Sequence, residues 1–174
     1  PAIIIPYYSV DGSLATFQRA GEAQPFCRLR YLGAQAALGF TKGKAKRYAQ
    51  PGESGTRVYF PRCLAWASIV NAVQEPIVIT EGEAKALVAA YAGLTCLALG
   101  GVWNFAVKGT DDLLPELRTI KWQGRTVYII FDSDAATNPA VIAAEARLVD
   151  ELQRKQGAQC TIIRLPPDGD NKEA

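Results

Sequence analysis

The sequence predicts an α/β fold, in which helices flank a parallel sheet, with a small basic and mostly β subdomain before it. From residue 76 onward, short apolar stretches alternate with helical patterns, which is typical of parallel strands joined by crossover helices. Before that point turn residues are frequent and helical periodicity is weak. The charge divides as well: residues 1–72 carry nine Lys or Arg and three Asp or Glu, whereas residues 73–174 carry ten and fourteen. We therefore predict two domains, 1–72 and 73–174.

The N-terminal domain should be a small antiparallel unit that binds a polyanion. Gly- and Pro-containing turns separate four expected strands, at residues 3–5, 14–19, 26–31 and 57–60. Residues 41–48, TKGKAKRY, place four positive charges within six residues and end in an aromatic side chain. Such a segment suits a phosphate backbone with base stacking, although it could equally be a solvated loop.

The C-terminal domain should hold four strands in one parallel sheet. We expect strands at residues 77–80, 94–99, 126–131 and 160–165, and helices at 83–91, 111–118 and 138–156. Gly93 suits the end of the first helix, and Asn138-Pro139 suits the start of the third. Ligands of parallel α/β sheets bind at the carboxyl ends of the strands, so residues that follow the strands are the candidates for function.

Acidic residues follow two of these strands. Glu81 comes directly after the first, and Asp132 and Asp134 come directly after the third. If the two strands are neighbours, three carboxylates converge at one edge, where an unpaired pair about 4 Å apart repels by roughly 4 kcal/mol at an effective dielectric of 20. A cluster of oxygen ligands without His or Cys favours Mg²⁺ or Mn²⁺, which supports phosphoryl transfer.

The same residues also have structural interpretations, which the sequence leaves open. Glu81 could cap the following helix. Gly82, Gly100 and Gly101 could be ordinary turn residues, or could let the backbone approach a phosphate. A G-x-G-x-x-G motif and a Walker lysine are absent, so dinucleotide-binding and P-loop functions lack support.

The composition excludes several classes of function. The chain has no His, which removes catalytic triads and His-metal chemistry. Its four cysteines are too far apart for a zinc knuckle and are expected to be reduced thiols. No apolar run approaches the roughly 18–20 residues of a membrane span, and a signal-peptide pattern is missing, so we expect a cytoplasmic protein without membrane contact. The absence of Met suggests a piece of a longer protein.

Two motifs resemble those of the Toprim family. Residues 77–86, IVITEGEAKA, resemble its first motif, a hydrophobic strand that ends in Glu-Gly. Residues 127–134, VYIIFDSD, resemble its second, a hydrophobic strand that ends in Asp-x-Asp. The resemblance covers roughly residues 74–170. It implies a Toprim fold in which Glu81 is a general acid/base or metal ligand, and Asp132 and Asp134 are metal ligands.

Two further features belong to this resemblance. Leu99-Gly100-Gly101 fits the glycine-containing loop after the second strand of the Toprim fold. Many primases carry an acid at the position of Lys85. The residue here is basic, as it is in type IA topoisomerases and in a group of mobile-element proteins. We count Lys85 among the catalytic candidates.

Within that family, the N-terminal half resembles phage and plasmid primases. Residues 5–12, IPYYSVDG, are similar to the opening of their small basic subdomain, and residues 46–52, KRYAQPG, and 57–61, RVYFP, to its later segments. Residues 165–170, LPPDGD, resemble the start of the primase tail, which implies a further metal contact at Asp168 or Asp170. The resemblance thus implies a DNA primase of a phage, plasmid or other mobile genetic element.

The primase hypothesis specifies ligands and partners. Single-stranded DNA template, nucleoside triphosphates and Mg²⁺ or Mn²⁺ would bind, and a helicase could act in cis or in trans. The residues expected to bind nucleic acid are Arg28, Arg30, Lys44, Lys46, Arg47 and Tyr48, and those of the phosphate loop are Gly82, Gly100 and Gly101.

Three alternatives stay open. A Toprim nuclease would use the same acids with water as the nucleophile. A haloacid-dehalogenase-like phosphatase could present Asp132-Ser133-Asp134 as its nucleophile motif, although that motif normally follows the first strand of its sheet. The chain could also be a non-catalytic module that binds nucleic acid.

Overall fold

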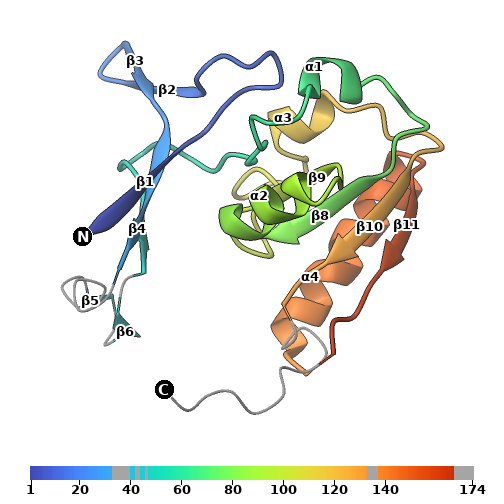
Figure 1. Ribbon diagram of the computed structural model, residues 1–174. Coiled ribbons are helices and arrows are strands. Elements are labelled where there is room, and N and C mark those ends of the chain that lie inside the picture. Colours follow the sequence, from blue (N-terminus) through green and yellow to red (C-terminus); the bar gives the residue numbers. More distant parts are fainter. Residues whose placement is uncertain (33–39, 42–43, 46, 133–136, 167–174) are drawn as a thin grey trace. The chain divides into compact units, whose positions relative to one another are not determined.

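The computed structural model describes residues 1–32, 40–41, 44–45, 47–132 and 137–166, of which 40, 41, 44 and 45 are described by their backbone alone (Figure 1). It forms two compact units, Pro1–Gly55 and Thr56–Ala174. Along these described ranges, no helix is both long and apolar enough to cross a membrane.

The first unit is built from short antiparallel strands. Strands β1 (Ala2–Pro6), β4 (Cys27–Tyr31) and β7 (Tyr48–Ala49) form one sheet in that order. Two hairpins accompany it, β2 (Thr16–Arg19) with β3 (Glu22–Pro25), and β5 (Phe40–Thr41) with β6 (Lys44–Ala45). The turn between β2 and β3 consists of Ala20 and Gly21, which both have positive φ, at 52° and 83°. That conformation matches the twist of a tight hairpin, so the chain reverses within two residues.

Aromatic side chains form the small core of this unit. Tyr7 and Phe26 are almost fully buried and meet edge to face, with ring centroids 4.9 Å apart. Phe17 from β2 meets Phe26 in the same geometry at 6.5 Å. Aromatic pairs in this arrangement gain roughly 0.5–1.5 kcal/mol beyond burial, which helps a unit with such short strands to hold together.

The second unit contains the expected parallel sheet. Its strands are β8 (Ile77–Glu81), β9 (Cys96–Leu99), β10 (Thr126–Ile130) and β11 (Gln159–Ile162), in the order β11-β10-β8-β9. All three neighbouring pairs are parallel. The helices are α1 (Trp66–Ile69), α2 (Glu83–Tyr91), α3 (Pro115–Arg118) and α4 (Pro139–Asp150), and a π-helical turn, η3 (Glu151–Lys155), follows α4. The α/β class predicted from the sequence is therefore confirmed.

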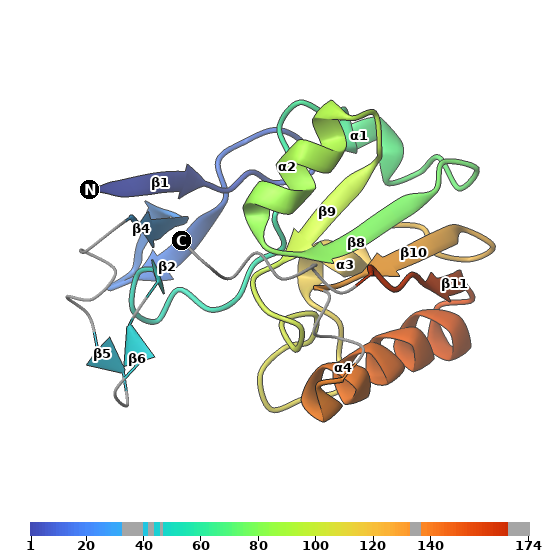
Figure 2. The same cartoon turned by 60° about the horizontal axis from the view of Figure 1, so that its bottom comes forward.

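The two long helices cover opposite faces of the sheet (Figure 2). The crossover through α2 leads from β8 outward to β9, whereas the crossover through α4 leads from β10 outward to β11. Crossovers are right-handed, so opposite directions along the sheet place their helices on opposite faces. Ile77, Ile79, Val127 and Ile129 face α4 and are fully buried. On the other face, α2 covers β8 and β9.

The compact units divide at Gly55 and Thr56, whereas the sequence placed the boundary between residues 72 and 73. Backbone contacts account for the difference. Tyr59 exchanges two hydrogen bonds with Ala98 of β9, at 2.9 and 3.0 Å. Phe60 packs on Trp66, with ring centroids 4.8 Å apart. Residues 56–72 thus join the unit of the parallel sheet, and the strand expected at residues 57–60 is a single bridge to its edge.

Candidate active site

The carboxyl ends of β8 and β10 lie next to each other. The two strands are paired in parallel, with Thr80 opposite Ile130. Glu81 ends β8, and Asp132 follows β10 by two residues. The condition on which the predicted acidic cluster depends, that the two strands are neighbours, is therefore met. The other predicted metal ligands, Asp134 and either Asp168 or Asp170, lie outside the described residues.

Gly82 turns the chain from β8 into α2 at this edge. It occupies the N-cap position with φ 90° and ψ 138°, a conformation that side-chain-bearing residues rarely adopt. Its amide donates to the carbonyl of Leu99, the last residue of β9, over 3.0 Å. Gly100 and Gly101 follow directly, so all three predicted phosphate-loop glycines lie at the carboxyl edge. Gly101 also has a structural reason to be glycine, because a Cβ at this position would lie only 3.3 Å from the side-chain amide nitrogen of Asn104.

Lys85 and Asp132 form an ion pair across this edge. Lys85 lies in the first turn of α2, and its ammonium donates to the Asp132 carboxylate. The two side chains are half exposed, at 50% and 47%. A pair this exposed contributes roughly 0–1 kcal/mol to stability. Its importance is positional, because it brings together two catalytic candidates that are 47 residues apart in the sequence.

Two residues at this edge carry the ligand type of a hard divalent cation. Within the described ranges, no group of three or more His, Cys, Asp or Glu side chains could hold a metal ion. Glu81 and Asp132 nevertheless supply carboxylate oxygens from adjacent strand ends, and oxygen ligands are those that Mg²⁺ and Mn²⁺ prefer. Asp132 also attracts a positive partner, since it is paired with Lys85.

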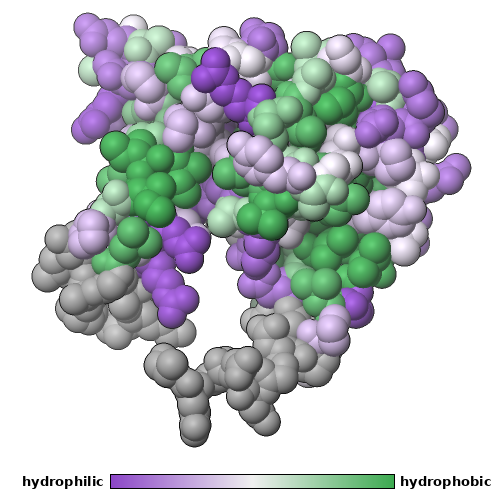
Figure 3. Space-filling view, viewed as in Figure 1, coloured by the Kyte–Doolittle hydropathy of each residue, from purple (hydrophilic) through white to green (hydrophobic). Residues whose placement is uncertain are grey.

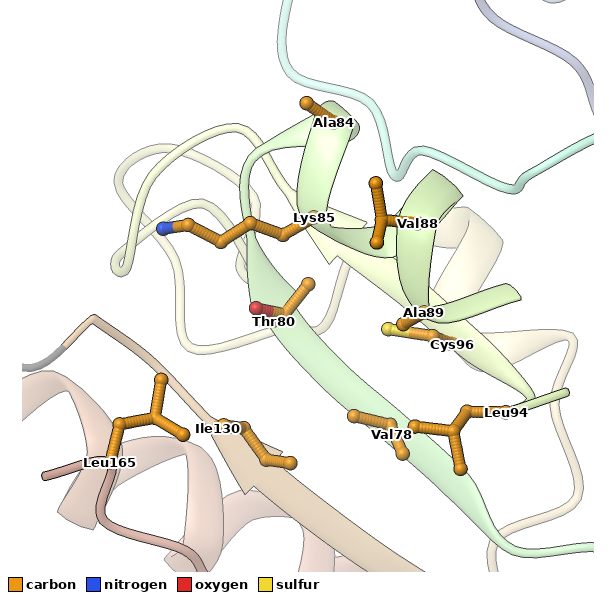
Figure 4. Close-up of a pocket in the computed structure, with 10 residues that line it drawn as sticks. All are labelled: Val78, Thr80, Ala84, Lys85, Val88, Ala89, Leu94, Cys96, Ile130 and Leu165. Atoms are coloured by element: carbon orange, nitrogen blue, oxygen red, sulfur yellow. The ribbon is translucent and has the colours of Figure 1, made fainter. Parts of the chain in front are cut away.

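A pocket of about 430 Å³ opens beside Lys85, between α2 and strands β8 and β10 (Figure 4). Aliphatic side chains dominate its lining, which comprises Val78, Thr80, Ala84, Lys85, Val88, Ala89, Leu94, Cys96, Ile130 and Leu165. Cys96 is fully buried, and burial raises the pKa of its thiol to about 12, so this group stays uncharged at neutral pH. Sequence reasoning missed the pocket. The available signal was the richness of α2 in alanine, since two of its alanines, Ala84 and Ala89, line the pocket.

A second group of predicted residues gathers in the N-terminal unit. Arg30 of β4 is paired with Tyr48 of β7, and Arg28 lies two residues before Arg30 on the same face. The guanidinium carbons of Arg28 and Arg30 lie 4.8 and 5.8 Å from the centroid of the Tyr48 ring. Two cations and an aromatic ring thus share one surface of the sheet.

The remaining predicted nucleic-acid residues are described less fully. Arg47 is exposed, and its carbonyl accepts a hydrogen bond from the Tyr31 amide over 3.0 Å. The backbone of Lys44 lies in β6, and Lys46 lies outside the described residues.

Arg164 is a cation at the carboxyl edge that sequence reasoning did not identify. It follows β11, and its guanidinium donates to Glu145 of α4 over 2.5 Å. Glu145 is fully buried, and its hydrogen bond raises the pKa of Arg164 above the usual value. A glutamate among the apolar residues of α4 was the signal, because a buried carboxylate requires a positive partner.

The fold and this edge define a mixed α/β protein with a four-stranded parallel sheet between helices and polar residues at the carboxyl ends of its central strands. A family model described as "Domain of unknown function (DUF3854)" matches residues 65–173. The chain belongs to this family. The matched range contains the whole parallel sheet and every residue of the candidate active site. No curated protein matches the chain, and neither does any solved structure.

Proposed function

We propose that this protein is a Toprim-type, metal-dependent nucleotidyltransferase, a DNA primase that acts in the replication of a phage, plasmid or other mobile element. One observation carries the proposal: β8 and β10 are neighbours, so Glu81, Asp132 and the Lys85 that pairs with Asp132 share one edge of the sheet. That arrangement agrees with the two sequence motifs that resemble the Toprim family. The expected location is the cytoplasm.

The acidic residues and the lysine at the carboxyl edge would have different roles in the reaction. Asp132 and Glu81, together with Asp134, would hold Mg²⁺ or Mn²⁺, which supplies positive charge to the phosphoryl group and to the attacking oxygen. The Lys85 ammonium would contact the phosphates of the nucleoside triphosphate. The 3′-hydroxyl of the growing strand attacks the α-phosphate, its proton passes to the Glu81 carboxylate, and pyrophosphate leaves.

The N-terminal unit would bind single-stranded DNA template. Arg28 and Arg30 would contact phosphates, and the Tyr48 ring beside them would stack on a base. Lys44, Lys46 and Arg47 would add positive charge, and a helicase in cis or in trans would supply the unwound template. The resemblance of this half of the chain to primases favours the primase over the nuclease alternative.

The test is primer synthesis on single-stranded DNA with labelled nucleotides and Mg²⁺ or Mn²⁺, with Asp132→Asn as the variant. Asp150→Asn is the matched control. Asp150 is equally exposed, at 48%, and also forms an ion pair, with Arg154. It lies at the end of α4, away from the carboxyl edge of the sheet. We expect Asp132→Asn to lose about 100-fold or more of the activity, as removal of a transition-state contact commonly does. Asp150→Asn should keep full activity.

Two outcomes would contradict this proposal. An Asp132→Asn protein that synthesises primers at the parent's rate would remove the acidic edge from the mechanism. Metal-dependent degradation of the labelled template without any synthesis would instead identify the nuclease.

A further inference from the structure

We propose that the apolar pocket between α2 and strands β8 and β10 receives the base of the incoming nucleoside triphosphate, whose phosphates meet Lys85 at the end of the pocket. This inference rests on the proposed function and specifies how its substrate is held. It concerns a cavity to which neither sequence motif assigns a role.

The position of the pocket is the first argument. Lys85 lines the pocket and also forms the ion pair with Asp132, so this side chain links the cavity to the acidic edge. Figure 4 shows the Lys85 side chain extending over the strands at one end, with Leu94 and Cys96 toward the other. A ligand here would have a charged end beside Asp132 and an uncharged end in the cavity.

The chemistry of the walls is the second argument. Seven of the ten lining residues are aliphatic, and the neutral Cys96 thiol adds another apolar contact. A wall of this kind packs against the faces of a planar ring and offers few hydrogen bonds to its edge. The volume, about 430 Å³, falls within the range of roughly 300–1,000 Å³ that is usual for small-molecule sites.

The exposure of this face is the third argument. On the opposite face, the residues of β8 and β10 (Ile77, Ile79, Val127 and Ile129) are fully buried, whereas Val88, Leu94 and Leu165 at the pocket are 69%, 48% and 44% exposed. Figure 3 shows hydrophobic side chains gathered over the β10 and β11 part of this face. Covering apolar surface gains roughly 25 cal/mol for each Å², so a ligand that covers the pocket is stabilised.

A nucleotide matches both ends of the site, and an apolar helix matches only one. Its base would cover the aliphatic walls, and its polyanionic tail would complement Lys85 and a cation at Asp132. Because the lining offers little to the edge of the base, binding should depend weakly on which base is present. A primase that copies any template requires such tolerance.

The experiment compares ATP, CTP and inorganic tripolyphosphate by titration calorimetry on the full chain with Mg²⁺. Ala89→Trp fills the pocket away from Lys85, and Val88→Trp is a second filling variant at an exposed position of the helix. Ala92→Trp is the control, because Ala92 follows the same helix and is exposed but does not line the pocket.

We expect the two filling variants to bind ATP and CTP about 10-fold more weakly, which is about the effect of losing one good apolar contact surface. Tripolyphosphate should bind the variants and the parent alike, and Ala92→Trp should bind all three ligands as the parent does. ATP and CTP should differ by no more than about threefold in the parent, or less than 1 kcal/mol.

The outcomes separate this inference from the function on which it rests. If the parent binds ATP and tripolyphosphate equally well, or if both filling variants bind ATP as the parent does, the base lies elsewhere and only the inference fails. If the parent binds neither ligand, the proposed function fails together with the inference.

Discussion

Arg125 is a fully buried arginine at the start of β10. Burial lowers the pKa of its guanidinium, an effect that Glu75 opposes, but the ordinary value is so high that the group stays charged at neutral pH. The guanidinium donates four hydrogen bonds of 2.8–3.2 Å, to the carbonyl oxygens of Lys121, Glu75, Ile69 and Val70. These bonds connect the end of α1 to the residue that precedes β10.

Arg125→Met should lower the free energy of unfolding by about 3 kcal/mol, because it leaves buried carbonyl oxygens without their donor. Arg118→Met is the matched control, since Arg118 is exposed at the end of α3 and should change stability by less than about 0.5 kcal/mol. Urea denaturation followed by tryptophan fluorescence measures both. Equal midpoints for the two variants would show that the carbonyl network adds nothing.

The sequence predicts residues at strand ends better than it predicts buried charges. Glu81 and Asp132 were assigned to one edge from their positions after hydrophobic strands, and the strand order brings them there. Arg125 gave no comparable signal. The acceptors of Arg125 are backbone carbonyls, which are the same for every residue type, and two of them lie more than fifty residues away.

At the scale of elements, α4 begins where its local sequence predicts. The Asn138 side chain accepts a hydrogen bond from the Ala140 amide over 3.1 Å, and Pro139 occupies the first turn. The end of the expected helix, residues 138–156, differs from the structure, because α4 ends at Asp150 and continues as the π-helical turn η3. A change in hydrogen-bond register leaves the apolar pattern largely intact, so periodicity does not reveal it.

Asn138→Ala should destabilise the second unit by about 1 kcal/mol, because it removes the side-chain acceptor for an amide in the first turn of α4. Asn138→Asp should keep the stability of the parent, since a carboxylate accepts the same bond and favours the helix N-terminus. Thermal unfolding of both variants distinguishes these effects. A loss of equal size in Asn138→Asp would mean that the cap bond is not what Asn138 contributes.

Short elements were the ones that the sequence did not reveal. Strands β5, β6 and β7 have two residues each, and α1 has four, which is too few for a period of two or of 3.6 to stand out. The helix expected at residues 111–118 is likewise reduced to Pro115–Arg118. Of the three strands, β7 pairs with β4, whereas β5 and β6 pair with each other.

At the scale of the molecule, the second unit should be more stable by itself when it retains residues 56–72. A fragment of residues 56–174 keeps the bridge between Tyr59 and Ala98 and all four acceptors of Arg125. A fragment of residues 73–174 loses that bridge and two of the acceptors. We expect the longer fragment to unfold cooperatively and the shorter one to melt at a lower temperature, as calorimetry would measure. Equal melting temperatures would favour the boundary predicted from the sequence.

The strand order also has a consequence for the time course of folding. Val78 and Cys96, which pair β8 with β9, are eighteen residues apart, whereas Ile77 and Val127, which pair β8 with β10, are fifty apart. The entropy lost on closing a loop grows with its length. The βαβ unit of β8, α2 and β9 can therefore form early, whereas the pairing of β8 with β10 requires a longer loop to close and forms later. Glu81 and Asp132 lie on the two sides of that junction. The acidic edge is therefore assembled late, after β8, α2 and β9 have come together.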